Sequence, residues 1–289
     1  MSLDLVANTV IGGALTGLVY GLMALGLSVI FGVVRVVNFA HGEMMTIAMY
    51  ATVALFSALD LDPFVAVVPI AAAFFAAGYL LQAGLINPFI TRPEHSQFML
   101  LVALAIIIVN ALLMAFGPDA RTAQLDYLLD PIEFGPLLID RGKLAAAAVA
   151  CVASAALFAF FRYTLTGTAI RACADNYLGA AVVGIRIRHL YALTFGLGAA
   201  CVGVAGCMMV LLVDVTPALG PAYTLLAFVI VIVGGLGSLT GALLGGVLIG
   251  VSEALAGVLF VPSAKSMFSF ALLVLVLLFR PQGLLGRRT

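Results

Sequence analysis

The sequence RYTLTGTAIRACADNYLGAAVVGIRIRH, residues 162–189, is the longest stretch between apolar segments that carries repeated basic side chains. Apolar residues recur within it at helical spacing, so residues 168–183 are predicted to form a short amphipathic helix. The apolar face would carry Ile170, Cys173, Tyr177, Leu178 and Ala181, and the polar face Arg171, Asp175 and Asn176, with Gly167 before the helix and Gly184 after it. A solvated loop helix would have the same pattern, so the meaning of this stretch depends on the segments around it.

The composition identifies the surrounding segments as membrane-spanning. Hydrophobic residues make up 64% of the 289 residues and charged residues only 9%. Soluble domains carry about 25% charged residues, so this chain could not cover a globular surface with polar groups. Residues 5–34 and 215–252 contain no charge, and each stretch exceeds the about 20 apolar residues that a transmembrane helix needs. The sequence therefore predicts an all-α, polytopic transmembrane protein.

The apolar segments predict about eight spans within a single transmembrane domain, residues 1–289. The predicted spans are 6–34, 40–59, 63–88, 97–117, 143–161, 189–213, the tract 222–260, and 264–280. The tract 222–260 is too long for one span and is interrupted by GGLGSLTG, residues 234–241. It is either two passes joined by a tight turn or a re-entrant hairpin. Gly13, Gly17 and Gly21 recur at a spacing that lets helices approach closely in lipid, which predicts helix packing.

The distribution of basic residues predicts the orientation, because cytoplasmic loops carry an excess of Lys and Arg. Placing 162–189 in the cytoplasm puts nine of the 13 basic residues inside. These nine are Arg35, Arg92, Arg162, Arg171, Arg186, Arg188, Arg280, Arg287 and Arg288. The amino terminus and the loop 118–142 would then lie outside, and the carboxyl terminus in the cytoplasm.

Two helix breaks are the candidate translocation pathway. The first is RVVNFAHGEM, residues 35–44, whose polar groups lie between two apolar spans; ionisable groups near membrane depth are costly and indicate a pathway or a partner. It is either a tight cytoplasmic turn, with Arg35 or His41 paired to Glu43, or an unwound segment that lines a cavity, as in transporters. The predicted pathway residues are Asn38, His41 and Glu43 in this break and Gly234, Gly235, Gly237 and Ser238 in the second.

Two isolated polar residues within spans carry weaker predictions. Asn110 is expected to form an interhelical hydrogen bond, and Glu253 to reach the outer interface. Motifs of enzyme chemistry are missing from the sequence: there is no GxxxxGK[ST] phosphate loop, no GxSxG and no CxxC, and the three histidines are far apart. We therefore expect no enzyme activity, no metal site and no cofactor in this chain.

Four blocks of the sequence together resemble a known family. They are GLVYGLMALGLSVIFGVVRVVNFAHGEM, TGTAIRACADNYLGAAVVGI, VGGLGSLTGALLGG and SFALLVLVLLFRPQGLLG, and they span residues 17–286. In content and order they resemble the permeases of branched-chain amino acid ABC importers. The NFAHGE segment makes the chain more similar to the LivH type than to the LivM type.

The resemblance implies a permease in the inner (plasma) membrane of a bacterium or archaeon. It implies a LivM-like second permease, two cytoplasmic ATPase subunits that bind the ATP, and a periplasmic binding protein; no nucleic acid partner is expected. The segment 162–189 would couple to an ATPase, with Ile170, Cys173, Tyr177 and Ala181 in a groove and Arg171 and Asp175 at its rim. Importers of urea, short amides or aromatic acids resemble the same pattern. A passive solute channel and an ion-coupled secondary transporter are the alternatives from other classes.

Overall fold

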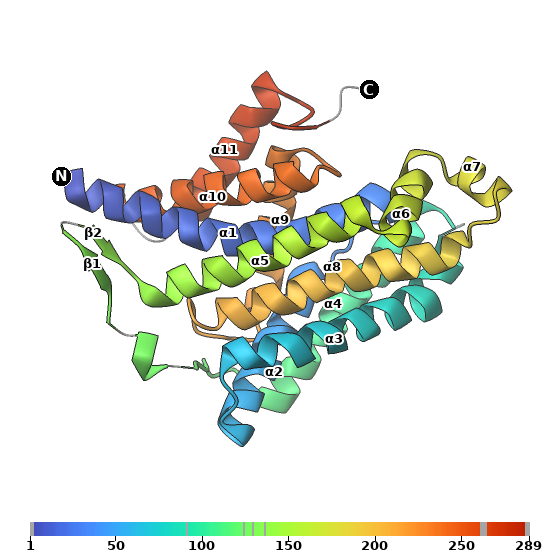
Figure 1. The fold of residues 1–289 in the computed structure, drawn as a ribbon. Helices are drawn as coiled ribbons and strands as arrows, with labels where there is room; N and C mark the ends of the chain where they lie inside the picture. Colours follow the sequence, from blue (N-terminus) through green and yellow to red (C-terminus); the bar gives the residue numbers. More distant parts are fainter. Residues whose placement is uncertain are drawn as a thin grey trace.

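The computed structural model describes residues 3–90, 92–123, 125–128, 130–135, 137–260 and 265–286, and nearly all of its regular structure is helical (Figure 1). The long helices are α1 (Leu3–Val34), α2 (His41–Leu59), α3 (Pro63–Leu81), α4 (Glu94–Phe116), α5 (Arg141–Tyr163), α8 (Ile187–Met209) and α10 (Leu239–Leu259). The shorter helices are α6 (Leu165–Asp175), α7 (Tyr177–Val182), α9 (Leu219–Gly234) and α11 (Lys265–Phe279). Short turns η1 (Gln82–Ile86) and η2 (Asn87–Phe89) extend α3, η3 covers Asp126–Leu128, and β1 (Ile132–Phe134) pairs antiparallel with β2 (Leu137–Ile139).

Among the described residues, seven helices are long and apolar enough to cross a membrane. They coincide with the spans predicted from hydrophobic runs, and α9 and α11 are shorter apolar helices. The prediction of an all-α polytopic membrane protein is therefore confirmed.

The loops predicted to face opposite sides of the membrane lie at opposite ends of the long helices. The amino terminus and the β1–β2 hairpin lie at one end, where Asn8 accepts a hydrogen bond from the Leu138 backbone N–H (Figure 1). Helices α6 and α7 lie at the other end (Figure 1). Two of the arginines predicted to be cytoplasmic, Arg287 and Arg288, lie outside the described residues.

Helix α8 is central to the bundle. Glycines of α1 bring that helix into close contact with α8 and α10. A Cβ atom on Gly17 of α1 would lie 2.6 Å from the carbonyl oxygen of Gly246 in α10. A Cβ atom on Gly26, further along α1, would lie 2.6 Å from the carbonyl oxygen of Gly198 in α8. The predicted packing role of the α1 glycines is thus confirmed, because only residues without a side chain allow these backbones to touch.

The tract 222–260 folds as two helices separated by a short turn. Helix α9 has 16 residues and is about 24 Å long, which is less than the about 30 Å of a bilayer core. It ends at Gly234, and Gly235 and Gly237 take positive φ angles of 107° and 76° in the turn. Helix α10 then begins after Ser238, whose hydroxyl accepts a hydrogen bond from the Gly241 N–H at 3.1 Å. The predicted break is where the sequence placed it.

At the first break, residues 35–40, the chain reverses direction and runs back into the helix bundle. Helix α1 ends at Val34, but the His41 ring at the start of α2 contacts the carbonyl oxygen of Met23, 2.9 Å away. Met23 lies 34 − 23 = 11 residues before the end of α1, or about 16 Å along its axis. The residues after α1 therefore run back beside it, and α2 begins inside the bundle instead of at its end.

Candidate functional site

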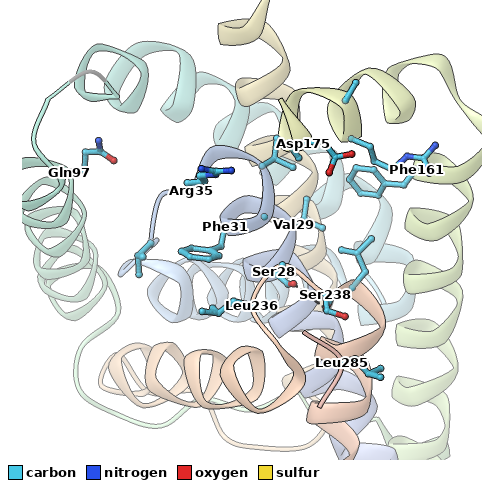
Figure 2. A pocket seen from close by; sticks show the side chains of 18 of the residues that line it. Ser28, Val29, Phe31, Arg35, Gln97, Phe161, Asp175, Leu236, Ser238 and Leu285 are labelled. Atoms are coloured by element: carbon cyan, nitrogen blue, oxygen red, sulfur yellow. Dashed lines mark hydrogen bonds between the residues drawn. The ribbon is translucent and has the colours of Figure 1, made fainter. Parts of the chain in front are cut away.

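A cavity of about 1460 Å³ lies where both helix breaks meet α6. Its wall combines the end of α1, the unwound segment 35–39, the turn 236–238, α6, and parts of α4 and the carboxyl-terminal tail. Figure 2 shows Arg35 and Asp175 at the same end of this cavity, away from Leu236 and Ser238. The polar lining residues are Ser28, Arg35, His95, Gln97, Thr168, Arg171, Asp175 and Ser238. We refer to it as the inner cavity.

Two of the predicted pathway residues line the inner cavity: Gly237 and Ser238. Both belong to the turn between α9 and α10. The Ser28 hydroxyl of α1 donates a hydrogen bond of 3.3 Å to the carbonyl oxygen of Ser238. This bond ties the turn to α1, so the backbone of the second break forms part of the cavity wall.

Three of the polar residues of the first break lie behind the cavity wall. Asn38, His41 and Glu43 are buried and do not line the inner cavity, whereas Arg35, Val37 and Phe39 do. Asn38 Oδ1 accepts a hydrogen bond of 3.1 Å from the N–H of Ala40, which folds the segment back on itself. The first break is therefore an unwound segment that lines a cavity, which is one of the two alternatives predicted from the sequence.

Glu43 and its neighbour Gly42 fix α2 to α9 through one side chain. The Thr224 hydroxyl donates a hydrogen bond of 2.7 Å to Glu43 Oε2 and accepts one of 2.8 Å from the Gly42 N–H. The pairing of Glu43 with His41 that a tight turn predicted is wrong, since His41 contacts Met23 instead. Thr224 was missed from the sequence because a single threonine in an apolar helix carries no signal.

Gly234 and Gly235 also lie behind the cavity wall, in close helix and tail contacts. A Cβ atom on Gly234 would lie 2.1 Å from the carbonyl oxygen of Gly241, and one on Gly235 2.4 Å from the backbone nitrogen of Gly286. The tail adds a hydrogen bond from the Leu285 N–H to the Gly234 carbonyl oxygen, 3.0 Å. Leu285 itself lines the inner cavity, a role of the tail that the sequence did not predict.

The predicted coupling helix is two helices, α6 and α7, joined at Asn176. The Asn176 side chain accepts a hydrogen bond from the Gly179 N–H at 2.9 Å and so starts α7 as an N-cap. At the other end of the segment, Gly184 has a positive φ of 86° and ends α7. The prediction of one continuous helix over 168–183 was wrong because this capping asparagine competes with helix continuation.

The predicted apolar face is divided by this break. Ile170 and Cys173 of α6 are buried within the chain's own core, and burial raises the pKa of the Cys173 thiol. Tyr177 and Ala181 of α7 are exposed. Gly167 allows α6 to lie on α5, since a Cβ atom there would be 2.4 Å from the Phe160 carbonyl oxygen. Ile170 and Cys173 therefore hold α6 in the bundle, and α7 offers the accessible apolar side chains.

The two charged residues of α6 face the inner cavity. Arg171 and Asp175 both line it, and the Arg171 guanidinium donates a hydrogen bond of 3.3 Å to the Thr168 hydroxyl. Movement of α6 would therefore change the cavity wall directly. The sequence had placed both side chains only on the polar face of a helix.

The two isolated polar residues, Asn110 and Glu253, each form a hydrogen bond in the structure. Asn110 donates a hydrogen bond of 2.8 Å to the Ile106 carbonyl oxygen of its own helix, so its predicted interhelical bond is wrong. Glu253 accepts a hydrogen bond of 2.7 Å from the Ser269 hydroxyl and is thereby tied to α11; its predicted approach to the outer interface stays a prediction.

Membrane-length helices, two helix breaks and a large cavity at one end define a multi-pass membrane transport protein. The chain belongs to the family described as branched-chain amino acid transport system / permease component, whose model matches residues 9–277.

Individual relatives agree with this family. The chain is 30% identical to the high-affinity branched-chain amino acid transport system permease protein LivH of Escherichia coli (strain K12), over 95% of this chain and 94% of the relative. It is 30% identical to the corresponding permease protein BraD of Pseudomonas aeruginosa, over 96% and 94%. A probable LivH of Methanocaldococcus jannaschii is 26% identical over 92% and 88%. No solved structure matches the chain.

Proposed function

We propose that this chain is the transmembrane permease subunit of an ATP-binding-cassette importer that moves branched-chain amino acids inward. The supporting observation is the inner cavity, whose wall joins both helix breaks to α6. A segment that contacts a cytoplasmic motor and also forms the cavity wall would couple nucleotide hydrolysis to cavity shape. The family and the names of the relatives support the substrate class.

The partners in this proposal follow from the importer class. A LivM-like second permease would complete the pathway, two cytoplasmic ATPase subunits would bind the ATP, and a periplasmic protein would deliver the solute. In a bacterial or archaeal inner membrane, the α6–α7 end would face the cytoplasm and the amino terminus the outside. Cysteine labelling of a cysteine-free chain tests the orientation. Glu133→Cys should react with an impermeant reagent in intact cells and Arg186→Cys should not, and the reverse pattern would invert the proposed topology.

In the proposed pathway, Gly237 and Ser238 contact the solute together with the cavity-lining residues of the unwound segment, Arg35, Val37 and Phe39. Asn38, His41, Glu43, Gly234 and Gly235 support them from behind.

Co-purification and reconstitution test the function. The chain should purify in mild detergent with a second permease and an ATPase, and the complex in proteoliposomes should take up L-leucine only with ATP and binding protein. Uptake without ATP would favour a passive channel. Uptake of urea, short amides or aromatic acids with no competition by L-leucine, L-isoleucine or L-valine would keep the importer class and replace the substrate.

The coupling role is assigned to the exposed side chains of α7, supported by the burial pattern. Leu178 is 62% exposed and Val182 88% exposed, whereas Ile170 is fully buried. Leu178→Asp should release the ATPase from a chain that still folds, because a charge would have to be desolvated in the partner's groove. Ile170→Asp should instead unfold the α6 region. If Leu178→Asp and Val182→Asp both retain ATPase and leucine-stimulated hydrolysis, α7 does not dock a motor.

A further inference from the structure

A second cavity, of about 370 Å³, lies at the opposite end of the bundle from the inner cavity, between α1, α5, α10 and α11. Its size falls within the about 300–1,000 Å³ of small-molecule sites. Charged groups enter it from three different helices: Lys143 from α5, Glu253 from α10 and Lys265 from α11. Ionisable groups within membrane helices are rare and costly, and they mark functional sites by default. We refer to it as the outer pocket.

The carboxylate of Glu253 is held in place by its neighbours. Ser269 of α11 donates a hydrogen bond of 2.7 Å to Oε1. The Tyr20 phenol of α1 and the Lys265 ammonium of α11 lie near enough to interact with the same carboxylate. The Ser269 hydrogen bond holds the carboxylate in the lining of the outer pocket, where it can accept a hydrogen bond.

Lys143 of α5 supplies an opposite charge to the same pocket. Its Nζ reaches across to α1, where a Cβ atom on Gly12 would lie 3.8 Å away. The structure gives this ammonium no hydrogen-bond acceptor among the residues it describes. Thr9 and Thr16 of α1 also line the pocket, and the absence of a side chain at Gly12 leaves space beside the Lys143 ammonium.

We propose that the outer pocket binds a zwitterionic α-amino acid, with its ammonium group at Glu253 and its carboxylate at Lys143. The small residues of α1 and α10, with Val258, would accommodate an aliphatic side chain. The identity of the amino acid rests on the proposed function, since the transported solute would meet this pocket before the inner cavity. A phospholipid headgroup that carries an ammonium and a phosphate offers the same pair of charges, so the test separates the two sources.

Direct binding tests the charge pattern. The full-length chain, purified in detergent without phosphatidylethanolamine, should bind L-leucine saturably. The keto acid 4-methyl-2-oxopentanoate lacks the ammonium and 3-methylbutylamine lacks the carboxylate. Each should bind at least about tenfold more weakly, because each lacks one of the two charged groups that form hydrogen bonds in the pocket. Equal binding of the keto acid, or no saturable binding of L-leucine, would overturn the proposal.

The lipid source is separated in nanodiscs. L-leucine should bind equally in phosphatidylcholine discs with and without phosphatidylethanolamine. Loss of leucine binding when phosphatidylethanolamine is added would assign the outer pocket to the headgroup instead.

Matched variants place the binding in this pocket. Lys143→Gln and Glu253→Gln should each raise the Kd for L-leucine at least about tenfold. Arg141→Gln removes the same charge two residues away, outside the pocket lining, and should change the Kd less than about twofold. Equal effects of Lys143→Gln and Arg141→Gln would show a general electrostatic effect and refute the site. Leucine uptake by the reconstituted importer is measured in parallel. Uptake without leucine binding in the outer pocket would contradict only the proposed binding site. Absence of uptake would contradict the proposed function.

Discussion

The two helix breaks reach the same cavity, but different interactions hold them open. The break after α1 is held by buried polar side chains: His41 on Met23, Asn38 on Ala40, and Glu43 on Thr224. The break between α9 and α10 is held by glycine contacts, a serine cap and the tail. Each break presents one polar side chain to the cavity, Arg35 or Ser238, beside apolar residues. Asn38, His41 and Glu43 of the first break lie behind the wall.

This difference shows that a polar residue at a membrane-depth break need not be a solute ligand. Unwinding frees backbone groups that must be satisfied without water. At the first break side chains satisfy them, and at the second break a tight turn and the tail do so. The first break should therefore be the more sensitive to loss of hydrogen bonds, whereas both breaks should be sensitive to added volume at their tightly packed glycines.

The largest effect is expected for a methyl group at Gly42. A Cβ atom there would lie 2.1 Å from the Gly220 carbonyl oxygen and 2.3 Å from the Thr224 nitrogen. Gly42→Ala should cost about 3 kcal/mol or more, because it adds a backbone clash and disturbs the Thr224 hydrogen bonds. Gly234→Ala adds only a clash and should cost about 1–3 kcal/mol.

Thermal unfolding in detergent measures both variants. Gly84→Ala is the control: its Cβ atom would meet nothing within 4 Å, so it should be neutral or slightly stabilising. Stability of Gly42→Ala and Gly234→Ala equal to that of the control would contradict the close contacts at both breaks.

The next largest loss of stability is expected when Thr224 can no longer form its two hydrogen bonds. Thr224→Val leaves both the Gly42 N–H and the Glu43 carboxyl without this partner and should cost about 2–4 kcal/mol, because each unsatisfied buried group costs about 1–3 kcal/mol. Glu43→Gln retains an acceptor for the hydroxyl and should cost less. A double-mutant cycle of the two changes measures their coupling by unfolding. Additive effects would mean that Glu43 and Thr224 do not interact.

A smaller effect is expected at the cap of the second break. Ser238→Ala should destabilise the protein by about 0.5–2 kcal/mol, because the Gly241 N–H loses its capping acceptor. Ser238→Thr keeps the hydroxyl and should retain most of the stability, while adding a methyl group to the cavity wall. If Ser238→Thr is as unstable as Ser238→Ala, the hydroxyl is not the cap.

The smallest change in stability is expected for cysteine substitutions at two neighbouring residues, but their labelling rates should differ strongly. Val37 lines the inner cavity, whereas Asn38 is fully buried. In a cysteine-free chain, Val37→Cys should react with a soluble thiol reagent at least about tenfold faster than Asn38→Cys, because reaction follows access of the thiolate. Faster labelling at residue 38 would place Asn38 on the cavity and reverse the assignment of wall and support.

The sequence determined the class of the protein and the position of its elements. Long apolar runs can satisfy their backbone only as helices in a membrane, so spans such as 6–34 and 143–161 followed from composition. Gly13, Gly17 and Gly21 indicated a close helix contact, and GGLGSLTG indicated the break at 234–241, because both signals are local. The content and order of four sequence blocks were enough to indicate the family.

Only the tertiary structure decided which residues line a cavity and which support it. The roles of Glu43 and Thr224 depend on a contact between residues 181 positions apart, and no local pattern carries that information. The orientation of the apolar face of α6 was also undecided by the sequence, because such a face fits either a partner or the chain's own core. In the structure, packing against α5 and α8 buries Ile170 and Cys173 in the core. Lys143 and Glu253 likewise share a pocket only because α5 and α10 both pack on α1.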